Sequence, residues 1–248
     1  MKTYRAVLFD LFGTVALFDR EKLPVFEWNG QISRSTMGSL RQIYEEQASG
    51  VSFERFFSTL SDVSGELGEE RIRSQREFSS VFRFTQTLLR LGFPDSQETQ
   101  AFAEQLSRAH MAILTRATVI PETHVHFLAQ VKQSYSTALI SNFDHGPTAR
   151  GVLRDGGVAE HFHHIIVSDD YGWRKPHPSI FTAALSAIGV EPTDALFVGD
   201  SPEDDIVGAK MVGMDVAWVN AQDAVLSRET PPPDYKIRAI PDLRVLLF

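Results

Sequence analysis

The chain has 248 residues, a formal net charge of −8 and no cysteine. This length suffices for one large α/β domain, or for a core domain with a smaller inserted one. Without cysteine, a thiol nucleophile, a thiolate zinc site and a disulfide framework are excluded. The negative charge without a local basic patch argues against a nucleic-acid partner. No apolar run reaches the roughly 18 residues of a membrane span, and residues 1–10 lack a secretory signal. We therefore expect a cytoplasmic protein.

The first predicted strand is Ala6–Phe9, a continuous apolar run that ends at Asp10. Such runs are typical of a central parallel strand covered on both faces. Residues 18–115 then read as mostly helical, with a small hairpin near 24–33 indicated by Asn29-Gly30. Helical spacing of apolar residues covers about Thr36 to Ser64, Glu69 to Leu91 and Ser96 to Thr115.

From residue 116 onward, strands and helices alternate. Strands are predicted at Ser136–Ile140, Ile165–Val167, Ala195–Val198, Val216–Val219 and, weakly, Tyr235–Ile237. Helices are predicted at His124–Lys132, Thr148–Gly156, Ser179–Ile188 and Asp204–Met211, with a short one from about Asp242. This alternation predicts a doubly wound parallel sheet with right-handed crossovers. The α/β core would comprise residues 1–17 and 116–248, with 18–115 inserted.

Polar clusters follow four of the predicted strands. They are Asp10–Thr14, Ser141–Asp144, Arg174–Pro176, and Gly199–Ser201 with Asp204 and Asp205 close behind. Because the carboxyl ends of parallel strands meet at one edge of a doubly wound sheet, we expect these clusters to lie together. Each cluster alone would read as a turn or a helix cap. Their repetition in the same position favours a functional site.

The combination suits phosphoryl transfer, which chiefly needs positioning and charge compensation around the phosphoryl oxygens. Asp10 can attack phosphorus and form an aspartyl intermediate. Asp10 and Asp200 can supply the carboxylates that Mg²⁺ prefers. Ser141 can donate a hydrogen bond to a phosphoryl oxygen, and Lys175 can offset negative charge.

These motifs resemble the haloacid dehalogenase-like hydrolase superfamily along essentially the whole chain. They stand here as Leu8–Thr14, Leu139–Asn142, Gly172–Pro178 and Val198–Ala209. The resemblance implies a Rossmann-like core with an inserted helical cap domain. It also implies Asp10 as nucleophile, the Phe12 carbonyl and Asp200 as Mg²⁺ ligands, and Ser141 and Lys175 as phosphoryl ligands. Thr14 and Asn142 are further substrate-binding candidates, and Asp205, Asp204 and Ser201 would support the site.

Phe12 departs from the phosphatase pattern, in which an aspartate at this position protonates the leaving alcohol. Phenylalanine cannot do so, and general acid–base help contributes about 10²–10⁴-fold. An aromatic residue here resembles the 2-haloacid dehalogenases, whose halide leaving group needs no proton and whose first cap helix carries a substrate arginine, as Arg41 would be. The Gly199-Asp200 pair with Asp204 and Asp205 instead resembles the metal-dependent phosphatases.

The sequence thus predicts a hydrolase with an aspartyl nucleophile. We expect a magnesium-dependent phosphatase of small phosphorylated metabolites with good leaving groups, in a monomer or a homodimer. The alternatives are a metal-independent 2-haloacid dehalogenase and a weakly active regulatory or binding protein.

Overall fold

The computed structural model describes residues 3–28, 30–48 and 50–248. The chain forms two compact units. The core unit runs up to Phe18 and from Val119 to the end, and the insert unit spans Asp19–Thr118. Where the chain passes between the units, β2 (Leu17–Phe18) and β5 (Thr118–Val119) form a two-stranded sheet.

The core unit is built on a six-stranded sheet in the order β10-β9-β8-β1-β6-β7, with every pairing parallel. The central strand β1 (Ala6–Phe9) pairs with both β6 and β8, its Ala6 lying beside Ser136 and Ala195. The remaining strands are β6 (Ser136–Ser141), β7 (His164–Val167), β8 (Ala195–Gly199), β9 (Asp215–Val219) and β10 (Tyr235–Ile237). The predicted fold class is therefore confirmed.

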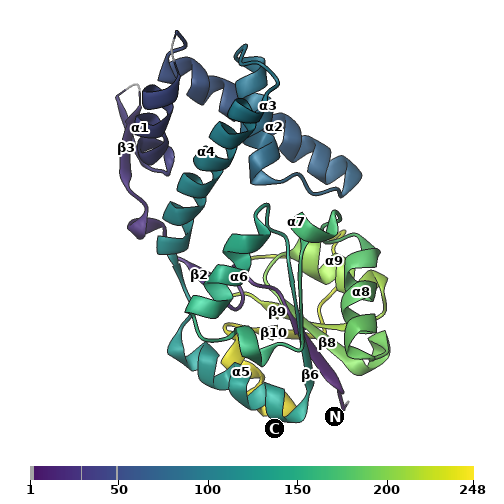
Figure 1. Cartoon of the computed structure of the whole chain (residues 1–248). Helices are drawn as coiled ribbons and strands as arrows, with labels where there is room; N and C mark the ends of the chain where they lie inside the picture. Colours follow the sequence, from purple (N-terminus) through teal and green to yellow (C-terminus); the bar gives the residue numbers. More distant parts are fainter. Residues whose placement is uncertain (1–2, 29, 49) are drawn as a thin grey trace. The chain divides into compact units, whose positions relative to one another are not determined.

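Helices cover both faces of this sheet (Figure 1). Side chains alternate along β1, so Val7 and Phe9 belong to one hydrophobic cluster, and Ala6 and Leu8 to the other. The first cluster includes residues of α5 (Glu122–Ser134) and α6 (Gly146–Asp155). The second includes residues of α8 (Pro178–Ile188) and α9 (Val207–Met211). This burial on both faces explains why β1 is uniformly apolar.

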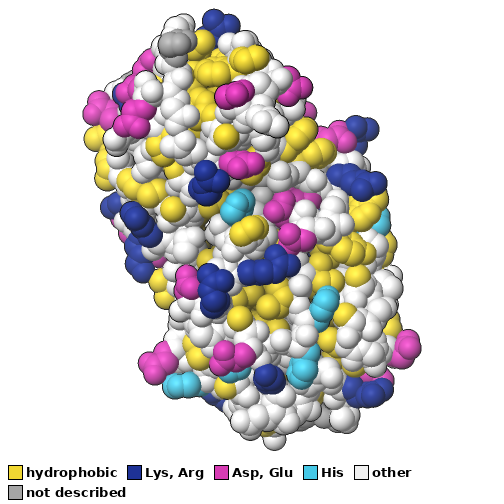
Figure 2. Space-filling view, viewed as in Figure 1, with side chains coloured by type: hydrophobic (Ala, Val, Ile, Leu, Met, Phe, Trp, Pro, Cys, Tyr) yellow, Lys and Arg dark blue, Asp and Glu magenta, His cyan; other side chains and the backbone are white. Residues whose placement is uncertain are grey.

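Short helical segments complete the core unit. They are η2 (Ala159–His161), α7 (Ser168–Tyr171), η3 (Pro192–Asp194), η4 (Pro202–Ile206), η5 (Ile240–Leu243) and α10 (Arg244–Leu247). Basic and acidic side chains are interspersed on the face drawn in Figure 2. Among the described residues, no helix combines the length and apolar character that crossing a membrane requires.

The insert unit is helical apart from one hairpin. Its elements are η1 (Arg20–Lys22), β3 (Val25–Trp28), β4 (Gln31–Arg34), α1 (Met37–Gln47), α2 (Phe53–Ser74), α3 (Ser80–Arg90) and α4 (Gln97–Arg116). The antiparallel strands β3 and β4 place Trp28 opposite Gln31, and the predicted turn residue Asn29 lies outside the described residues. An aromatic cluster holds the helices together, with Tyr44 stacked on Phe56 at a centroid distance of 4.3 Å.

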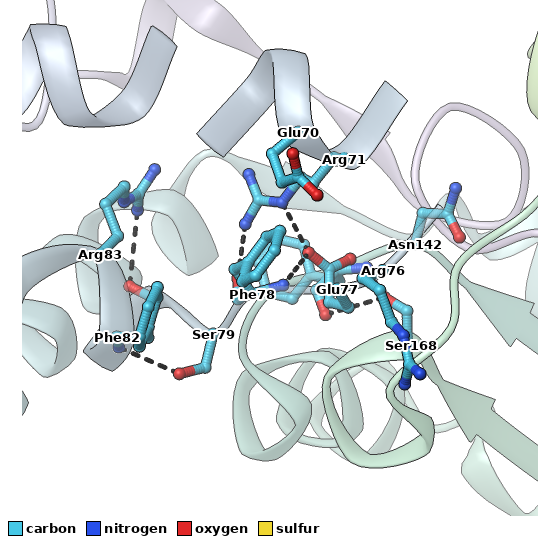
Figure 3. A network of polar contacts seen from close by, with 12 residues as sticks. Glu70, Arg71, Arg76, Glu77, Phe78, Ser79, Phe82, Arg83, Asn142 and Ser168 are labelled. Carbon is cyan, nitrogen blue, oxygen red and sulfur yellow. Dashed lines mark hydrogen bonds and ion pairs between the residues drawn. The ribbon is translucent and has the colours of Figure 1, made fainter. Parts of the chain in front are cut away.

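The predicted break between the first two helical stretches of this unit is wrong. We expected it between Ser64 and Glu69, but α2 continues to Ser74 and ends where Gln75 adopts a left-handed conformation, φ 56°. The following loop folds back on the helix (Figure 3). Arg71 contacts the Glu77 carboxylate at 2.7 Å and donates to the Phe78 carbonyl oxygen at 2.5 Å. These contacts, which the apolar spacing does not report, set the helix end.

Gln75→Gly should stabilise the insert unit. A left-handed conformation costs a side-chain-bearing residue about 1–2 kcal/mol. The larger entropy that glycine loses on folding offsets about 0.5–1 kcal/mol of the gain from removing that cost. We expect a net gain of about 0.5–1 kcal/mol in the free energy of unfolding. Calorimetric unfolding measures it. Ser74→Gly, one residue earlier and still helical, should destabilise, and a gain from both substitutions would contradict this account.

Candidate active site

The sheet order itself assembles the site, because β1 lies between β6 and β8. Asp10 directly follows β1, and its backbone N–H donates to the Val198 carbonyl oxygen at 2.9 Å. Ser141 is the last residue of β6, and Asp200 directly follows β8. The three side chains therefore start from adjacent strand ends at the edge where open α/β sheets place ligands.

Lys175 is buried at this edge and bridges two carboxylates. Its Nζ donates to Asp10 Oδ1 at 2.6 Å and to Asp205 Oδ1 at 2.7 Å, and only 1% of the residue is exposed. The ring of Phe197 lies beneath the ammonium at 5.4 Å from its centroid. A buried charge is tolerated when it is paired and hydrogen-bonded. The two carboxylates meet that need.

Asp205 is held by a turn that differs from the predicted helix. We expected a regular helix over Asp204–Met211, but Pro202–Ile206 forms a π-helical turn before α9. Ser201 caps this turn, since its hydroxyl accepts from the Asp204 N–H, while the Ser201 N–H donates to Asp205 Oδ2 at 2.9 Å. π-Helical turns are rare and frequent at functional sites. This one turns the Asp205 carboxylate toward Lys175.

Two glycines leave room for the acidic side chains. A Cβ on Gly199 would lie 2.3 Å from Asp205 Oδ2, and a Cβ on Gly13, which has φ +90°, would lie 2.2 Å from Asp200 Oδ2. Neither separation is possible without a shift, so both positions need glycine for the close approach. In the sequence, each of these glycines lies within three residues of an aspartate that follows an apolar strand. We did not assign either glycine a role.

The cluster carries excess negative charge. Asp10, Asp200 and Asp205 each offer a carboxylate oxygen, and these atoms all lie within 4.8 Å of one another. Burial raises the pKa of Asp10 to about 7, against the opposing attraction of Lys175. Burial and the charge of Asp205 raise the pKa of Asp200 to about 6. For Lys175, the two neighbouring carboxylates outweigh burial and raise the pKa, so the ammonium stays charged.

These residues fit a divalent cation. Asp10 Oδ2 is buried and has no hydrogen-bond partner among the described residues, and Asp200 provides a second carboxylate close by. Three carboxylates against one ammonium leave two negative charges unbalanced when all are ionised. Mg²⁺ takes oxygen ligands, typically one or two of them protein carboxylates. The donor set therefore suits a divalent cation such as Mg²⁺.

The predicted hydroxyl donors lie at the same edge. Ser141 and Thr14 are fully buried. The Ser141 hydroxyl has no hydrogen-bond partner among the described residues, whereas Thr14 lies close enough to Asp200 for a hydrogen bond that opposes the rise in its pKa. An unsatisfied buried hydroxyl costs about 1–3 kcal/mol. The Ser141 hydroxyl therefore calls for an explanation, and an anionic ligand at this edge would provide an acceptor for it.

Other predicted residues are placed differently. Asn142 directs its side chain at the backbone of Lys175, donating to its carbonyl oxygen at 2.9 Å and accepting from its N–H at 2.7 Å. The Phe12 ring packs on Phe143, with centroids 4.6 Å apart. Arg41 belongs to the insert unit, where it donates to Glu54 at 2.9 Å and lies over the ring of Phe53. Its proposed contact with substrate stays a prediction.

Asp204 adds a further carboxyl group to this edge of the sheet, and Trp218 holds the backbone at Asp200. Burial raises the pKa of Asp204, with Lys175 opposing the shift. The indole N–H of Trp218, at the end of β9, donates to the Asp200 carbonyl oxygen at 2.9 Å and so fixes the backbone that carries this carboxylate. We assigned Trp218 no role, because nothing in its position along the strand distinguishes it from a core residue.

Comparison with known proteins agrees with this geometry. A family model described as haloacid dehalogenase-like hydrolase matches residues 4–213. A phosphoserine phosphatase of Thermus thermophilus is 34% identical over 143 residues, which are 58% of this chain and 53% of that protein. This chain thus aligns with about half the length of that relative.

Two solved structures match the fold along the chain. A 2-haloacid dehalogenase from Pseudomonas syringae gives a TM-score of 0.75 at 24% identity, covering 100% of this chain and 98% of its own. A HAD phosphatase from Thermococcus onnurineus gives 0.63 at 26% identity, with the same coverage. With a family match over most of its length and this site at the strand ends, the chain belongs to the haloacid dehalogenase-like hydrolases.

Proposed function

We propose that this protein is a magnesium-dependent phosphatase that acts through Asp10 on small phosphorylated molecules with good leaving groups. The observation that carries this proposal is the acidic cluster. Asp10, Asp200 and Asp205 cluster near the single ammonium of Lys175, and Asp10 Oδ2 has no hydrogen-bond partner in the part of the chain that the structure describes. An excess of buried carboxylate needs a cation, and a phosphoryl group brings further negative charge that a cation would offset. The phosphatase relatives support this class of reaction.

The residues divide the reaction into two steps. In the first, the Asp10 carboxylate attacks phosphorus, the bond from phosphorus to the leaving oxygen breaks, and an acyl phosphate forms on Asp10. In the second, water attacks the same phosphorus, which releases inorganic phosphate and restores the carboxylate. Lys175 donates to Asp10 Oδ1 and so fixes the carboxylate, while Oδ2, which has no hydrogen-bond partner among the described residues, would face the cation. The hydroxyls of Ser141 and Thr14 would donate to phosphoryl oxygens.

A bound Mg²⁺ would supply charge compensation for the phosphoryl oxygens. Asp10 and Asp200 would hold it, with the Phe12 backbone carbonyl as a third protein ligand. Asp205 engages Lys175 through Oδ1 and the Ser201 N–H through Oδ2, so its part is to keep the ammonium in place.

Phe12 restricts the substrate. Its ring, packed against Phe143, offers no proton to a departing oxygen. An alkoxide leaves poorly without protonation, whereas a nitrophenolate or a carboxylate leaves readily. The protein should therefore hydrolyse p-nitrophenyl phosphate and acetyl phosphate faster than sugar phosphates. Steady-state rates on this panel, with Mg²⁺ and with EDTA, test the proposal, and equal rates with EDTA would contradict the metal requirement.

The same aromatic position also favours a second candidate, 2-haloacid dehalogenation. In that reaction Asp10 would displace a halide, which needs no proton. Against it, the three carboxylates at this edge would repel an anionic haloacid unless a cation offset them. Turnover of 2-chloropropionate in EDTA, without turnover of any phosphate ester, would establish the dehalogenase. Binding of phosphate without turnover of either class would indicate a regulatory or binding protein.

Asp10→Asn should abolish turnover. The amide is nearly isosteric but a poor nucleophile, so we expect less than about 1% of the wild-type rate, in line with the loss of a covalent catalyst. Initial rates on p-nitrophenyl phosphate measure this. The controls are thermal unfolding and circular dichroism, which should show a folded protein. A folded variant that keeps a substantial rate would remove Asp10 from the nucleophile's role.

Magnesium should stabilise the protein more at about pH 8 than at about pH 5. The raised pKa values of Asp10 and Asp200, about 7 and about 6, mean that the folded protein keeps protons that the unfolded chain releases from about pH 4 upward. These groups thus stabilise the metal-free protein at low pH, and their contribution falls as the pH rises through 7. Mg²⁺ competes with those protons, so its effect grows with pH.

Unfolding temperatures with Mg²⁺ and with EDTA at both pH values measure this difference. Comparing Mg²⁺ with EDTA at the same pH cancels contributions to stability that do not depend on the metal. Asp200→Asn removes one carboxylate and should reduce the Mg²⁺-dependent increment at both pH values. A Mg²⁺ increment that is the same at both pH values in the wild type would contradict the assignment of these carboxylates.

Phe12→Asp should raise the rate on alkyl phosphates roughly tenfold or more by restoring a general acid. Phe12→Asn is the matched control, because it loses the same contact with Phe143, worth about 0.5–1.5 kcal/mol, without gaining a proton donor. The ratio of the two variants' kcat/KM values on a sugar phosphate isolates the contribution of the general acid to the rate. A ratio near one in two folded variants would mean that the proton comes from elsewhere.

A further inference from the structure

Lys175 is fixed from its backbone as well as from its ammonium. Asn142, which directly follows β6, donates from Nδ2 to the Lys175 carbonyl oxygen at 2.9 Å and accepts at Oδ1 from the Lys175 N–H at 2.7 Å. One carboxamide thus satisfies both backbone polar groups of a residue 33 positions away. We propose that Asn142 is a positioning residue, which places the Lys175 ammonium between Asp10 and Asp205 and does not itself bind the substrate.

A lysine needs such an anchor at this site. Its four-carbon stem is flexible, and its ammonium is a point charge without a preferred plane. Here the side chain is almost completely buried, so a displaced backbone would leave both the ammonium and the carboxylates of Asp10 and Asp205 unpaired. Breaking a buried ion pair by removing one partner is strongly destabilising. Asn142 therefore holds in place the residue whose ion pairs would be the most destabilising to break.

Only a carboxamide of this length matches the task. Its oxygen accepts from the Lys175 N–H while its NH₂ group donates to the carbonyl oxygen of the same residue. A carboxylate could accept from the N–H but could not donate to the carbonyl oxygen, and alanine could do neither. The bonds also tie the loop that carries Lys175 to the end of β6, which pairs directly with β1, the strand that precedes Asp10.

The same loop is also packed closely by α9. A Cβ on Gly208 would lie 3.0 Å from the backbone Cα of Pro176 and 2.4 Å from the ring of Phe181. Gly208 therefore allows α9 to approach the residue next to Lys175. The bonds from Asn142 and this close packing together restrain the backbone around Lys175.

A double-mutant cycle tests whether Asn142 acts through Lys175. The variants are Asn142→Ala, Lys175→Met and the two combined, assayed on p-nitrophenyl phosphate with Mg²⁺. We expect Asn142→Ala alone to lower kcat about tenfold or more, since small misplacements cost up to about 10²-fold. In the Lys175→Met background it should change kcat by less than about twofold. An equal loss in both backgrounds would show direct contact with the substrate and overturn the proposal.

The effect on kcat rests on the proposed function, so a second measurement is independent of it. The amine of Lys175 in the wild type should react slowly with an acylating reagent, read by mass spectrometry against the exposed Lys132. Asn142→Ala should raise the labelling of Lys175 severalfold and leave Lys132 unchanged. Unchanged labelling of Lys175 would overturn the proposal. Wild-type protein without turnover would overturn only the proposed function.

The chain offers a matched control in Asn220. Its side chain makes the same pair of bonds to one residue, donating to the Ala224 carbonyl oxygen at 2.9 Å and accepting from the Ala224 N–H at 2.8 Å. Asn220→Ala removes an equivalent anchor that does not touch Lys175. It should therefore leave the labelling of Lys175 at the wild-type rate. Equal labelling in both variants would mean general loosening and would overturn a specific role for Asn142.

Discussion

The buried ammonium of Lys175 is the interaction on which the site depends. It lies 2.6 Å from Asp10 and 2.7 Å from Asp205, so it brings the end of β1 and the turn after β8 to one point. One positive charge cannot balance three carboxylates, and this mismatch is the physical reason for expecting a cation beside Asp10 and Asp200. The glycines at 13 and 199 follow from the same crowding, because each leaves space for a carboxylate.

The sequence predicted the parts of the site that depend on topology. Once Ala6–Phe9, Ser136–Ile140 and Ala195–Val198 are recognised as parallel strands, the residues after them must share one edge. The features that the sequence did not predict depend on side-chain direction and on local backbone conformation. Nothing in the residue types indicates that Asn142 turns to the Lys175 backbone, or that Pro202–Ile206 forms a π turn. Both depend on contacts between residues far apart in the sequence or on local backbone conformation, which are known only after the chain is folded.

In the insert unit, too, the sequence predicted the helices but not the residue at which one of them ends. The periodicity of its apolar residues predicted helices, and the aromatic cluster around Tyr44 and Phe56 explains why that pattern is retained. The apolar spacing placed a break between Ser64 and Glu69, whereas α2 runs through Gly65 and Gly68 to Ser74, and a long packed helix tolerates glycine at about 1 kcal/mol each. The contact of Arg71 with Glu77 is local in space, yet it leaves no periodic signal.

Phe12 and the acidic cluster together narrow the chemistry. Under the proposed function, Asp10 and a bound cation would lower the barrier to attack at phosphorus, while Phe12 would leave the departure of the alcohol unassisted. The rate would then depend on how stable the leaving anion is. Acyl and aryl phosphates need the least help, because their anions are weak bases. The acidic cluster thus argues for a phosphoryl substrate, and on this proposal Phe12 would limit which phosphoryl substrates the protein turns over.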